Sequence, residues 1–446
     1  LDNADLDIMR QLNTMPDSVK FQFDFLNDDW KPVADGGKIP NGLWKIIQTT
    51  PQKLIIYINP PYLEVGNKKV LTGTGNNRTG KTTTDIKSQM KENGLGSASN
   101  ELFMQFYYRI YNEIPQCTIG SFSKLKNCIS PNFEKWREKF KAKFLGGFVC
   151  RANSFDNVKG GFPISFQIWS CETNGGFPQK LNFDVFEIIK MPKGTDRDLE
   201  KAEKVGVKTV YNFPIKGLIN PWLHTNNKSV DEALCWIDKG RNDFQHNNFV
   251  ALYSKLCDHA CKITQTNLVQ GLIYLAVRLC IPATWLNDRD QFTTPRKATK
   301  EENFALQSKD NTTQEQHYEY EGDENFINNC VVFALFEKNN TNWQIFPNSQ
   351  IGINGVERDM KIYGLLLKGR GFSPEAEAVL EVVRAIYVLY HKEFNNPNAS
   401  WYEVQKELKE SKNIIYGDLR RDFLKAQRIL AMEVASDVYK YGFLME

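Results

Sequence analysis

The chain has 446 residues, of which 41% are hydrophobic and 24% are charged, and this balance excludes a disordered or fibrous protein. Its length predicts two to three domains with sizeable cores. The formal net charge of +3 permits binding to nucleic acid without favouring it. No apolar run reaches the length of a membrane span, so we expect no membrane partner.

The nine cysteines and five histidines predict neither a disulfide framework nor a metal site. Three residues separate Cys257 from Cys261, but no second pair with zinc spacing accompanies them. The histidines form no cluster along the chain. We therefore expect reduced thiols, a cytoplasmic location and no bound metal.

Two segments near the start of the chain look like strand material and contain acidic residues. Residues 1–9 contain Asp2 and Asp5, and we expect them to form a strand end. Residues 21–27 alternate between aromatic and polar side chains, which predicts a second strand that contains Asp24. An aspartate at a strand end is often only a helix cap, so its residue type alone assigns no role.

The most informative segment is an apolar run, residues 54–58, followed directly by Asn59-Pro60-Pro61-Tyr62. The run is short, continuous and rich in β-branched residues, which predicts a buried strand. Two prolines end this strand, because neither can donate to the sheet ladder and each fixes its own φ. The sequence therefore predicts a rigid polar loop at the carboxyl end of a central strand, where open α/β sheets bind ligands.

Such a loop suits a reaction at a planar amino group. The side-chain oxygen of Asn59 and the carbonyl of Pro60 can each accept one hydrogen of an exocyclic amine, which frees the nitrogen lone pair. The ring of Tyr62 can stack on the face of the base. A base inside a duplex is out of reach, so the substrate base must be flipped out of the stack.

Further strands and one helix are expected after this loop. Ser99 or Asn100 can cap a helix whose apolar residues recur at helical spacing up to Phe106. Strand-like segments follow at four places in the sequence: residues 119–123, 144–150, 155–169 and 181–190.

The Asn-Pro-Pro-Tyr motif after a hydrophobic strand resembles the catalytic motif of N6-adenine DNA methyltransferases. The order of segments around it is similar to the catalytic domain of that family over about the first 190 residues. The resemblance implies an α/β fold with a methyltransferase-like (Rossmann-like) sheet. It also implies S-adenosylmethionine as cofactor and double-stranded DNA as the partner that carries the substrate base.

The resemblance assigns roles to individual residues. Catalytic roles fall on the motif and on one late aromatic that faces the base opposite the tyrosine: Asn59, Pro60, Pro61, Tyr62 and Phe166, with Phe162 in reserve. Contacts to the cofactor fall on three acids and one aromatic: Asp2, Asp5, Asp24 and Phe25. Asp24 would reach the adenine ring of the cofactor, and Asp2 or Asp5 its ribose.

One feature of the family is missing from this sequence. In the subclass with this motif order, a glycine-rich loop before the catalytic motif holds the methionine part of the cofactor. The glycines that precede Asn59 are Gly36, Gly37 and Gly42, in a loop-like stretch. We therefore expect the chain to be the downstream part of a longer polypeptide, or to work with a separate subunit that carries the loop.

Two other functions stay open. Residues 75–82 fit the phosphate-binding pattern G-x-x-x-x-G-K-[ST], but neither a convincing strand nor a helix start flanks them, so a phosphate-loop nucleotidase is the weaker alternative. A basic loop that contacts DNA phosphates and an ordinary solvated loop are equally good interpretations of this stretch. The stronger alternative is a DNA-binding or specificity subunit that retained the pocket and lost the cofactor site.

The later part of the chain is expected to contain mixed and then mainly helical structure. We place the catalytic domain at residues 1–190, a mixed domain for DNA target recognition at 191–345 and a mainly helical region at 346–446. Helices are expected at residues 267–281, 373–391, 401–410 and 416–441, and residues 326–337 predict a buried strand or helix. Residues 285–290 and the helix that begins at Ser373 resemble the C-terminal part of large adenine methylases of restriction–modification systems.

Overall fold

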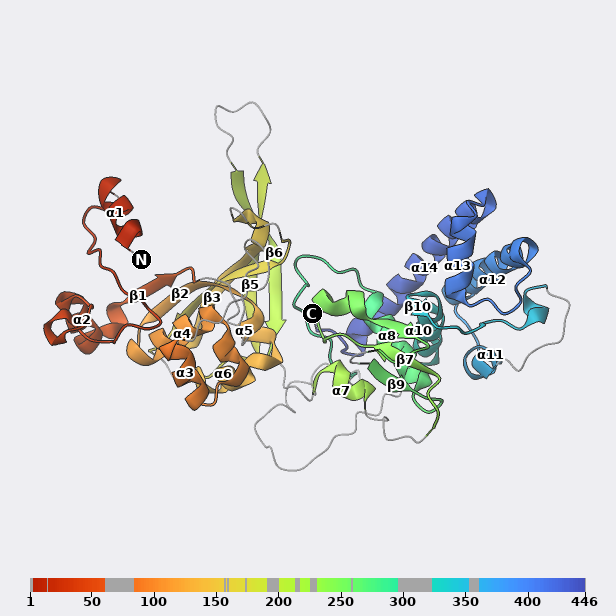
Figure 1. Ribbon diagram of the computed structural model, residues 1–446, viewed down its shortest axis with the longest axis horizontal. Coiled ribbons are helices and arrows are strands. Elements are labelled where there is room, and N and C mark those ends of the chain that lie inside the picture. The colour runs from red at the N-terminus through yellow and green to blue at the C-terminus, as the bar shows by residue number, and fades with distance from the viewer. Residues whose placement is uncertain are drawn as a thin grey trace. The chain divides into compact units, whose positions relative to one another are not determined.

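The computed structural model describes most of the chain as a mixed α/β protein. The described residues are 3–13, 15–60, 84–155, 158, 160–172, 175–190, 200–212, 217–224, 231–257, 260–295, 323–352 and 361–445. The chain forms two compact units, Leu1–Pro214 and Ile215–Glu446, and each has its own sheet and its own covering helices (Figure 1).

The first unit contains a six-stranded sheet with the order β1-β2-β4-β3-β5-β6. Its strands are β1 (Ile55–Ile58), β2 (Thr118–Lys124), β3 (Lys143–Arg151), β4 (Pro163–Ser170), β5 (Lys180–Lys190) and β6 (Glu200–Tyr211). The pairs β1–β2 and β3–β5 are parallel, and the other neighbouring pairs are antiparallel. Consequently β1, β2, β3 and β5 all point the same way, and their carboxyl ends share one edge of the sheet.

Helices cover one face of this sheet (Figure 1). The helices of the unit are α1 (Asn3–Gln11), α2 (Asn41–Thr49), α3 (Asp85–Glu92), α4 (Leu102–Glu113), α5 (Lys126–Ile129) and α6 (Glu134–Lys139). From α4 and α6, the buried rings of Tyr107 and Trp136 pack with Phe140, which contacts Trp169 of β4 at 5.1 Å between ring centroids. This aromatic core fixes the helices against the strands.

The expectation that residues 54–58 form a buried central strand is only partly met. Residues 55–58 do form β1, but β1 is outermost among the described strands, and Ile55 and Tyr57 are 77% and 67% exposed. An apolar, β-branched run indicates a strand because of its local propensity. It carries no information on how many neighbours that strand has.

The prediction of two strands before β1 is wrong. Residues 3–11 form helix α1, and residues 21–27 form an irregular segment that ends in turns. The aromatic residues of this segment pack around the guanidinium of Arg109, which lies 5.4 Å from the ring of Phe23 and 5.6 Å from that of Phe25. Their alternation therefore reflects contacts with α4 and not a position in a sheet.

The second unit combines a four-stranded sheet with long helices. The strands are β7 (Cys235–Asp238), β8 (Ala251–Tyr253), β9 (Ala260–Ile263) and β10 (Asn339–Asn340), in the order β10-β8-β7-β9. The helices are α7 (Ile219–Leu223), α8 (Leu268–Leu279), α10 (Glu324–Phe336), α11 (Lys361–Leu366), α12 (Pro374–Phe394), α13 (Trp401–Glu410) and α14 (Ile414–Lys440). One hydrophobic cluster, from Ile219 to Leu444, joins the sheet to these helices.

Short 3-10 helices connect several of these elements. They are η1 (Val33–Asp35), η2 (Pro51–Lys53), η4 (Gly96–Asn100), η5 (Pro131–Phe133), η6 (Ala152–Ser154), η8 (Phe244–Phe249) and η9 (Asn348–Gln350).

The first sheet extends beyond residue 190, where we placed the end of the catalytic domain, because β6 pairs with β5. The functional division into recognition and helical regions stays a prediction.

The helices expected late in the chain are confirmed. Ser373 caps α12 by accepting a hydrogen bond from the backbone N–H of Ala376 at 3.1 Å, and Pro374 occupies the first turn. Ser400 and Glu403 form a reciprocal capping box at α13. Residues 324–336 form α10, so the strand alternative for this segment is excluded.

Candidate functional site

The predicted catalytic loop begins at the carboxyl end of β1. Asn59 is exposed and Pro60 is buried, directly after the last paired residue, Ile58. Ile58 pairs with Ser121 of β2, and Ser121 pairs with Gln167 of β4. If this register is continued by one residue, Asn59 lies level with Phe122 and Phe166, two strand spacings or about 10 Å from Phe166.

Phe166 lies in a cluster of aromatic rings on the face of the sheet that carries Tyr57. Its ring centroid is 5.9 Å from that of Tyr57, 4.9 Å from Phe122 and 5.5 Å from Phe148. A Cβ atom on Gly120 would lie 3.0 Å from Cζ of Phe166, so the glycine gives this ring room to lie over the strand. Phe166 is half-buried and therefore keeps part of its surface for another ring.

Buried polar groups hold the opposite face of the same strands. The amide of Gln167 on β4 is hydrogen-bonded to Asn127 of α5, with 2.9 Å from Asn127 Nδ2 to Gln167 Oε1. The hydroxyl of Ser165 donates to the carbonyl of Ser123 at 3.0 Å. Because these groups are fully buried, their hydrogen bonds fix how β2, β4 and α5 fit together.

The described residues resume at Thr84, which is buried in the core. Thr84, at the N-cap of α3, is 2% exposed, and its hydroxyl accepts a hydrogen bond from the N–H of Lys87 at 3.0 Å. The same hydroxyl donates to Gln105 Oε1 of α4 at 2.6 Å. Pro61, Tyr62 and the phosphate-binding pattern at residues 75–82 lie outside the described residues.

The predicted cofactor residues Asp24 and Phe25 have local partners. One carboxylate oxygen of the exposed Asp24 accepts the N–H of Leu26 at 3.0 Å, and the other accepts Nδ2 of Asn27 at 2.8 Å. The ring of Phe25 stacks on Phe106 of α4, with 5.1 Å between centroids. Asp24 therefore stabilises its own turn, and a contact with a cofactor stays a prediction.

The other two predicted cofactor acids, Asp2 and Asp5, lie at the start of the chain. Asp2 lies outside the described residues, and Asp5 lies in α1 with its side chain undescribed. The expected strand end at this position is therefore wrong for Asp5, because the backbone there is helical. Phe162, the reserve aromatic, precedes β4, and its carbonyl accepts the N–H of Ala152 at 2.8 Å.

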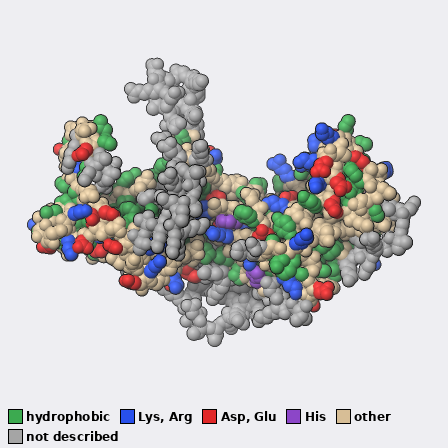
Figure 2. All heavy atoms as spheres, viewed as in Figure 1, with side chains coloured by type: hydrophobic (Ala, Val, Ile, Leu, Met, Phe, Trp, Pro, Cys, Tyr) green, Lys and Arg blue, Asp and Glu red, His purple; other side chains and the backbone are tan. Residues whose placement is uncertain are grey.

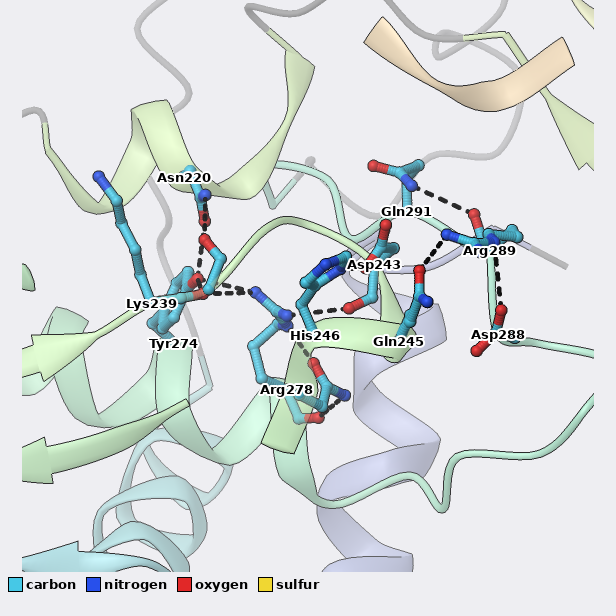
Figure 3. A network of polar contacts seen from close by, with 12 residues as sticks. Asn220, Lys239, Asp243, Gln245, His246, Tyr274, Arg278, Asp288, Arg289 and Gln291 are labelled. Carbon is cyan, nitrogen blue, oxygen red and sulfur yellow. Dashed lines mark hydrogen bonds and ion pairs between the residues drawn. The ribbon is translucent and has the colours of Figure 1, made fainter. Parts of the chain in front are cut away.

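A polar network in the second unit was not expected from the sequence (Figure 3). Its centre is Arg278 of α8, which is fully buried and donates to four neutral oxygens. Nε bonds Asn247 Oδ1 at 2.7 Å, Nη1 bonds Tyr274 Oη at 2.8 Å and Lys239 O at 3.2 Å, and Nη2 bonds Asp243 O at 3.1 Å. These bonds tie the segment between β7 and η8 to α8.

Two aspartates, Asp243 and Asp288, lie beside this network, and each contacts a basic side chain. Nδ1 of His246 is in close contact with Oδ1 of Asp243, and the Asp288 carboxylate lies 3.1 Å from Nε of Arg289. Burial raises the pKa of Asp288, and the nearby Asp243 raises it further, while Arg289 lowers it. A backbone hydrogen bond links η8 to the segment after α8: the N–H of Gln245 donates to the Asp288 carbonyl at 3.1 Å.

The sequence contained one signal for this network. Arg278 is the one charged residue among the twelve residues of α8. A charge on a helix that is apolar on all sides must be buried with partners. That argument indicates a buried arginine, but it cannot say which segments supply the acceptors.

Comparison with known proteins adds no family for this chain: neither a protein-family model nor a curated protein matches it. Across the described part of the chain, no group of three or more His, Cys, Asp or Glu side chains is arranged to hold a metal ion. The helices described here include none with the length and apolar character needed to cross a bilayer.

Proposed function

We propose that this chain is the catalytic region of a site-specific DNA methyltransferase that transfers a methyl group from S-adenosylmethionine to N6 of a flipped adenine. One observation carries the proposal. Asn59 and Pro60 follow β1 at the edge of the sheet where four strands point their carboxyl ends, and the register, continued by one residue beyond Ile58, brings Asn59 level with Phe166. Ligands of open α/β sheets bind at this edge.

The strand order supports the finer expectation of a methyltransferase-like sheet. The segments at residues 119–123, 144–150 and 155–169 were expected to be its later strands. They contribute β2, β3 and β4, and all three belong to the same sheet as β1. The parallel pair β1–β2 joined across α4 is the βαβ unit from which such folds are built.

The resemblance of the Asn-Pro-Pro-Tyr motif assigns the roles of the residues, and the placement of Asn59, Pro60 and Phe166 on one sheet is compatible with them. When bound, S-adenosylmethionine supplies an electrophilic methyl group on a sulfonium. The side-chain oxygen of Asn59 and the carbonyl of Pro60 accept the two N6 hydrogens and direct the nitrogen lone pair at that methyl group. Phe166 and Tyr62 enclose the base from its two faces. Positioning of this kind supplies most of the rate enhancement of such a transfer.

A second candidate, a DNA-binding or specificity subunit without its own cofactor site, is favoured by a different observation. Both oxygens of Asp24 accept hydrogen bonds within their own turn, and Asp5 lies in a helix. The described residues thus fit the cofactor only in part. Cofactor binding separates the two candidates, because the subunit would bind DNA without binding S-adenosylmethionine.

The distribution of charge on the surface does not by itself indicate that the partner is DNA. In the face shown in Figure 2, acidic and basic side chains are mixed over the helical end of the second unit. This mixture agrees with the small net charge of the chain. The proposal of a DNA substrate therefore depends on the loop and its aromatic neighbours and not on a large basic surface.

The substitution Asn59→Ala tests the proposal. It removes one of two acceptors that hold the amine, and the loss of a preorganised contact to a transition state costs on the order of a hundredfold in rate. Transfer of labelled methyl groups into DNA by the native polypeptide is the measurement. We expect activity to fall by at least that factor.

Asn248→Ala is the matched control, because Asn248 is an exposed asparagine of η8 in the other unit. This variant should keep full activity. Because Asn59 is exposed, its replacement should leave the circular dichroism spectrum and thermal midpoint unchanged. Near-normal methyl transfer by a folded Asn59→Ala protein would remove the loop from catalysis.

A further inference from the structure

The two faces of the six-stranded sheet differ sharply. On the face under the helices, the side chains of Ser121, Gln167 and Phe183 have no exposed surface. On the opposite face, which we call the open face, Tyr57 is 67% and Val207 58% exposed. The paired registers place the residues of the open face without ambiguity, because side chains alternate along each strand.

The centre of the open face is a row of aromatic rings. It contains one ring from each of five strands: Tyr57, Phe122, Phe166, Phe148 and Phe186. Centroids of neighbouring rings lie between 4.9 Å, for Phe122–Phe166, and 6.3 Å, for Tyr57–Phe122, and the row ends with Phe148–Phe186 at 5.7 Å. Five strands at ~4.8 Å spacing give this row a length of about 19 Å.

Lysines lie around this row. Among the residues whose side chains are described, the registers place four lysines on the open face: Lys124, Lys143, Lys180 and Lys204. Among the side chains described on this face there is one carboxylate, Asp184, which is 2.7 Å from Lys204. The open face is therefore positive, although the chain as a whole is nearly neutral.

We propose that the open face binds an unpaired stretch of nucleic acid, with bases stacked on the aromatic row and phosphates near the lysines. Aromatic side chains on an open sheet bind successive unpaired bases in known recognition modules, and each stacked base contributes about 1–3 kcal/mol by alanine substitution. The row begins at Tyr57, two residues before Asn59. A strand opened around a flipped base would thus continue onto this face.

Charge complementarity favours nucleic acid over a protein partner. A helix packed on this face would bring Lys143 and Lys180 to the margin of an apolar contact, where they would need acidic partners, whereas Lys204 already pairs with Asp184. Phosphates satisfy them directly. The inference is tested apart from methyl transfer, because it concerns binding without cofactor and its test substitutes Tyr57 and Lys143, to which catalysis assigns no role.

The test is fluorescence anisotropy of a labelled single strand of thymidines with the full chain in the absence of cofactor. Tyr57→Ala should raise the dissociation constant by between about fivefold and about a hundredfold. Tyr57→Phe should bind as wild type, because the ring and not the hydroxyl does the stacking. Lys143→Gln should lower the salt slope of binding by about 0.7, the share of one phosphate contact on a single strand.

Three controls make the result specific. Tyr402→Ala removes a ring of α13 that is 49% exposed and should bind as wild type. Asn59→Ala should also bind as wild type, so that failure of the catalytic proposal and failure of this one are told apart. An abasic strand of the same length should bind more weakly than thymidines.

Equal binding of thymidines by wild type and Tyr57→Ala would overturn the proposal, and so would equal binding of the abasic strand. If Tyr57→Ala instead abolished self-association in sedimentation and left strand binding unchanged, the open face would be an interface between copies of the chain. That outcome would also overturn the proposal.

Discussion

At the scale of single residues, Arg278 shows how a buried cation organises a unit without a carboxylate bond. Its donors meet a side-chain amide, a phenol and two backbone carbonyls, and its guanidinium lies 4.8 Å from the ring of Phe292. Burial lowers the pKa of Arg278, whereas Tyr274 and Asp243 raise it. Neutral acceptors of this kind lower the cost of burying the charge.

Arg278→Lys is expected to destabilise the protein although it keeps the charge. A lysine carries its donors on one nitrogen and cannot reach acceptors that lie along different edges of the planar guanidinium. Buried acceptors without partners cost about 1–3 kcal/mol each, so we expect a loss on the order of 3 kcal/mol in the free energy of unfolding. Urea denaturation measures it, with the exposed Arg241→Lys as control. Equal midpoints for both variants would show that the network contributes little.

At the scale of elements, the junction of α10 with α14 carries a titratable group. Glu337 is the C-cap of α10, and burial raises the pKa of its carboxyl, while Lys338 and Gln427 lower it. A carboxylate is also disfavoured at the C-terminal end of a helix. The folded protein therefore keeps this proton at a pH where the unfolded chain has released it.

The sign of the pH effect follows from this difference. Between the ordinary pKa of 4.5 and the raised value in the fold, the unfolded state binds fewer protons, so stability falls as pH rises. Glu337→Gln removes this pH dependence. Above the raised pKa the variant should be more stable than wild type, and at low pH the stabilities of the two proteins should be most similar. Urea midpoints of both proteins from pH 4 to 7 measure the difference. Parallel curves would mean that Glu337 ionises in the fold as it does in the unfolded chain.

The sequence predicts an element correctly when the residues that determine it are close together in the chain, and less well when they are far apart. The start of α12 is encoded locally by Ser373 and Pro374, and it is predicted correctly. Residues 55–58 encode a strand but not its place in a sheet, so the position of β1 was wrong. Residues 21–27 were misassigned because the packing partner of their aromatic residues, Arg109, lies more than eighty residues later. Of the candidate site, Asn59 and Phe166 were predicted from sequence, and the open face was not, since it requires the registers of six strands.

At the scale of the whole molecule, the first unit has the start of the proposed catalytic loop, Asn59 and Pro60, and the aromatic open face on the same sheet. The second unit has a single hydrophobic cluster of its own. The described residues fit S-adenosylmethionine only in part, because Asp24 is engaged in its own turn and the glycines before Asn59 form no glycine-rich pattern.

Residues 1–446 expressed as such are therefore expected to bind S-adenosylmethionine too weakly for calorimetry to resolve. Addition of a segment with a glycine-rich loop, in the same chain or as a separate subunit, should restore binding. Isothermal titration without and with that segment is the measurement. A micromolar dissociation constant, equivalent to about −8 kcal/mol, for residues 1–446 alone would contradict this expectation.

The central claim is that Asn59 serves methylation of adenine in DNA. Direct sequencing of modified bases in DNA from cells that express the native gene, with and without Asn59→Ala, tests it most directly. We predict N6-methyladenine at a recurring site in cells with the unaltered gene and its loss in cells with the substitution. The same methylated sites at the same occupancy in both would contradict the claim.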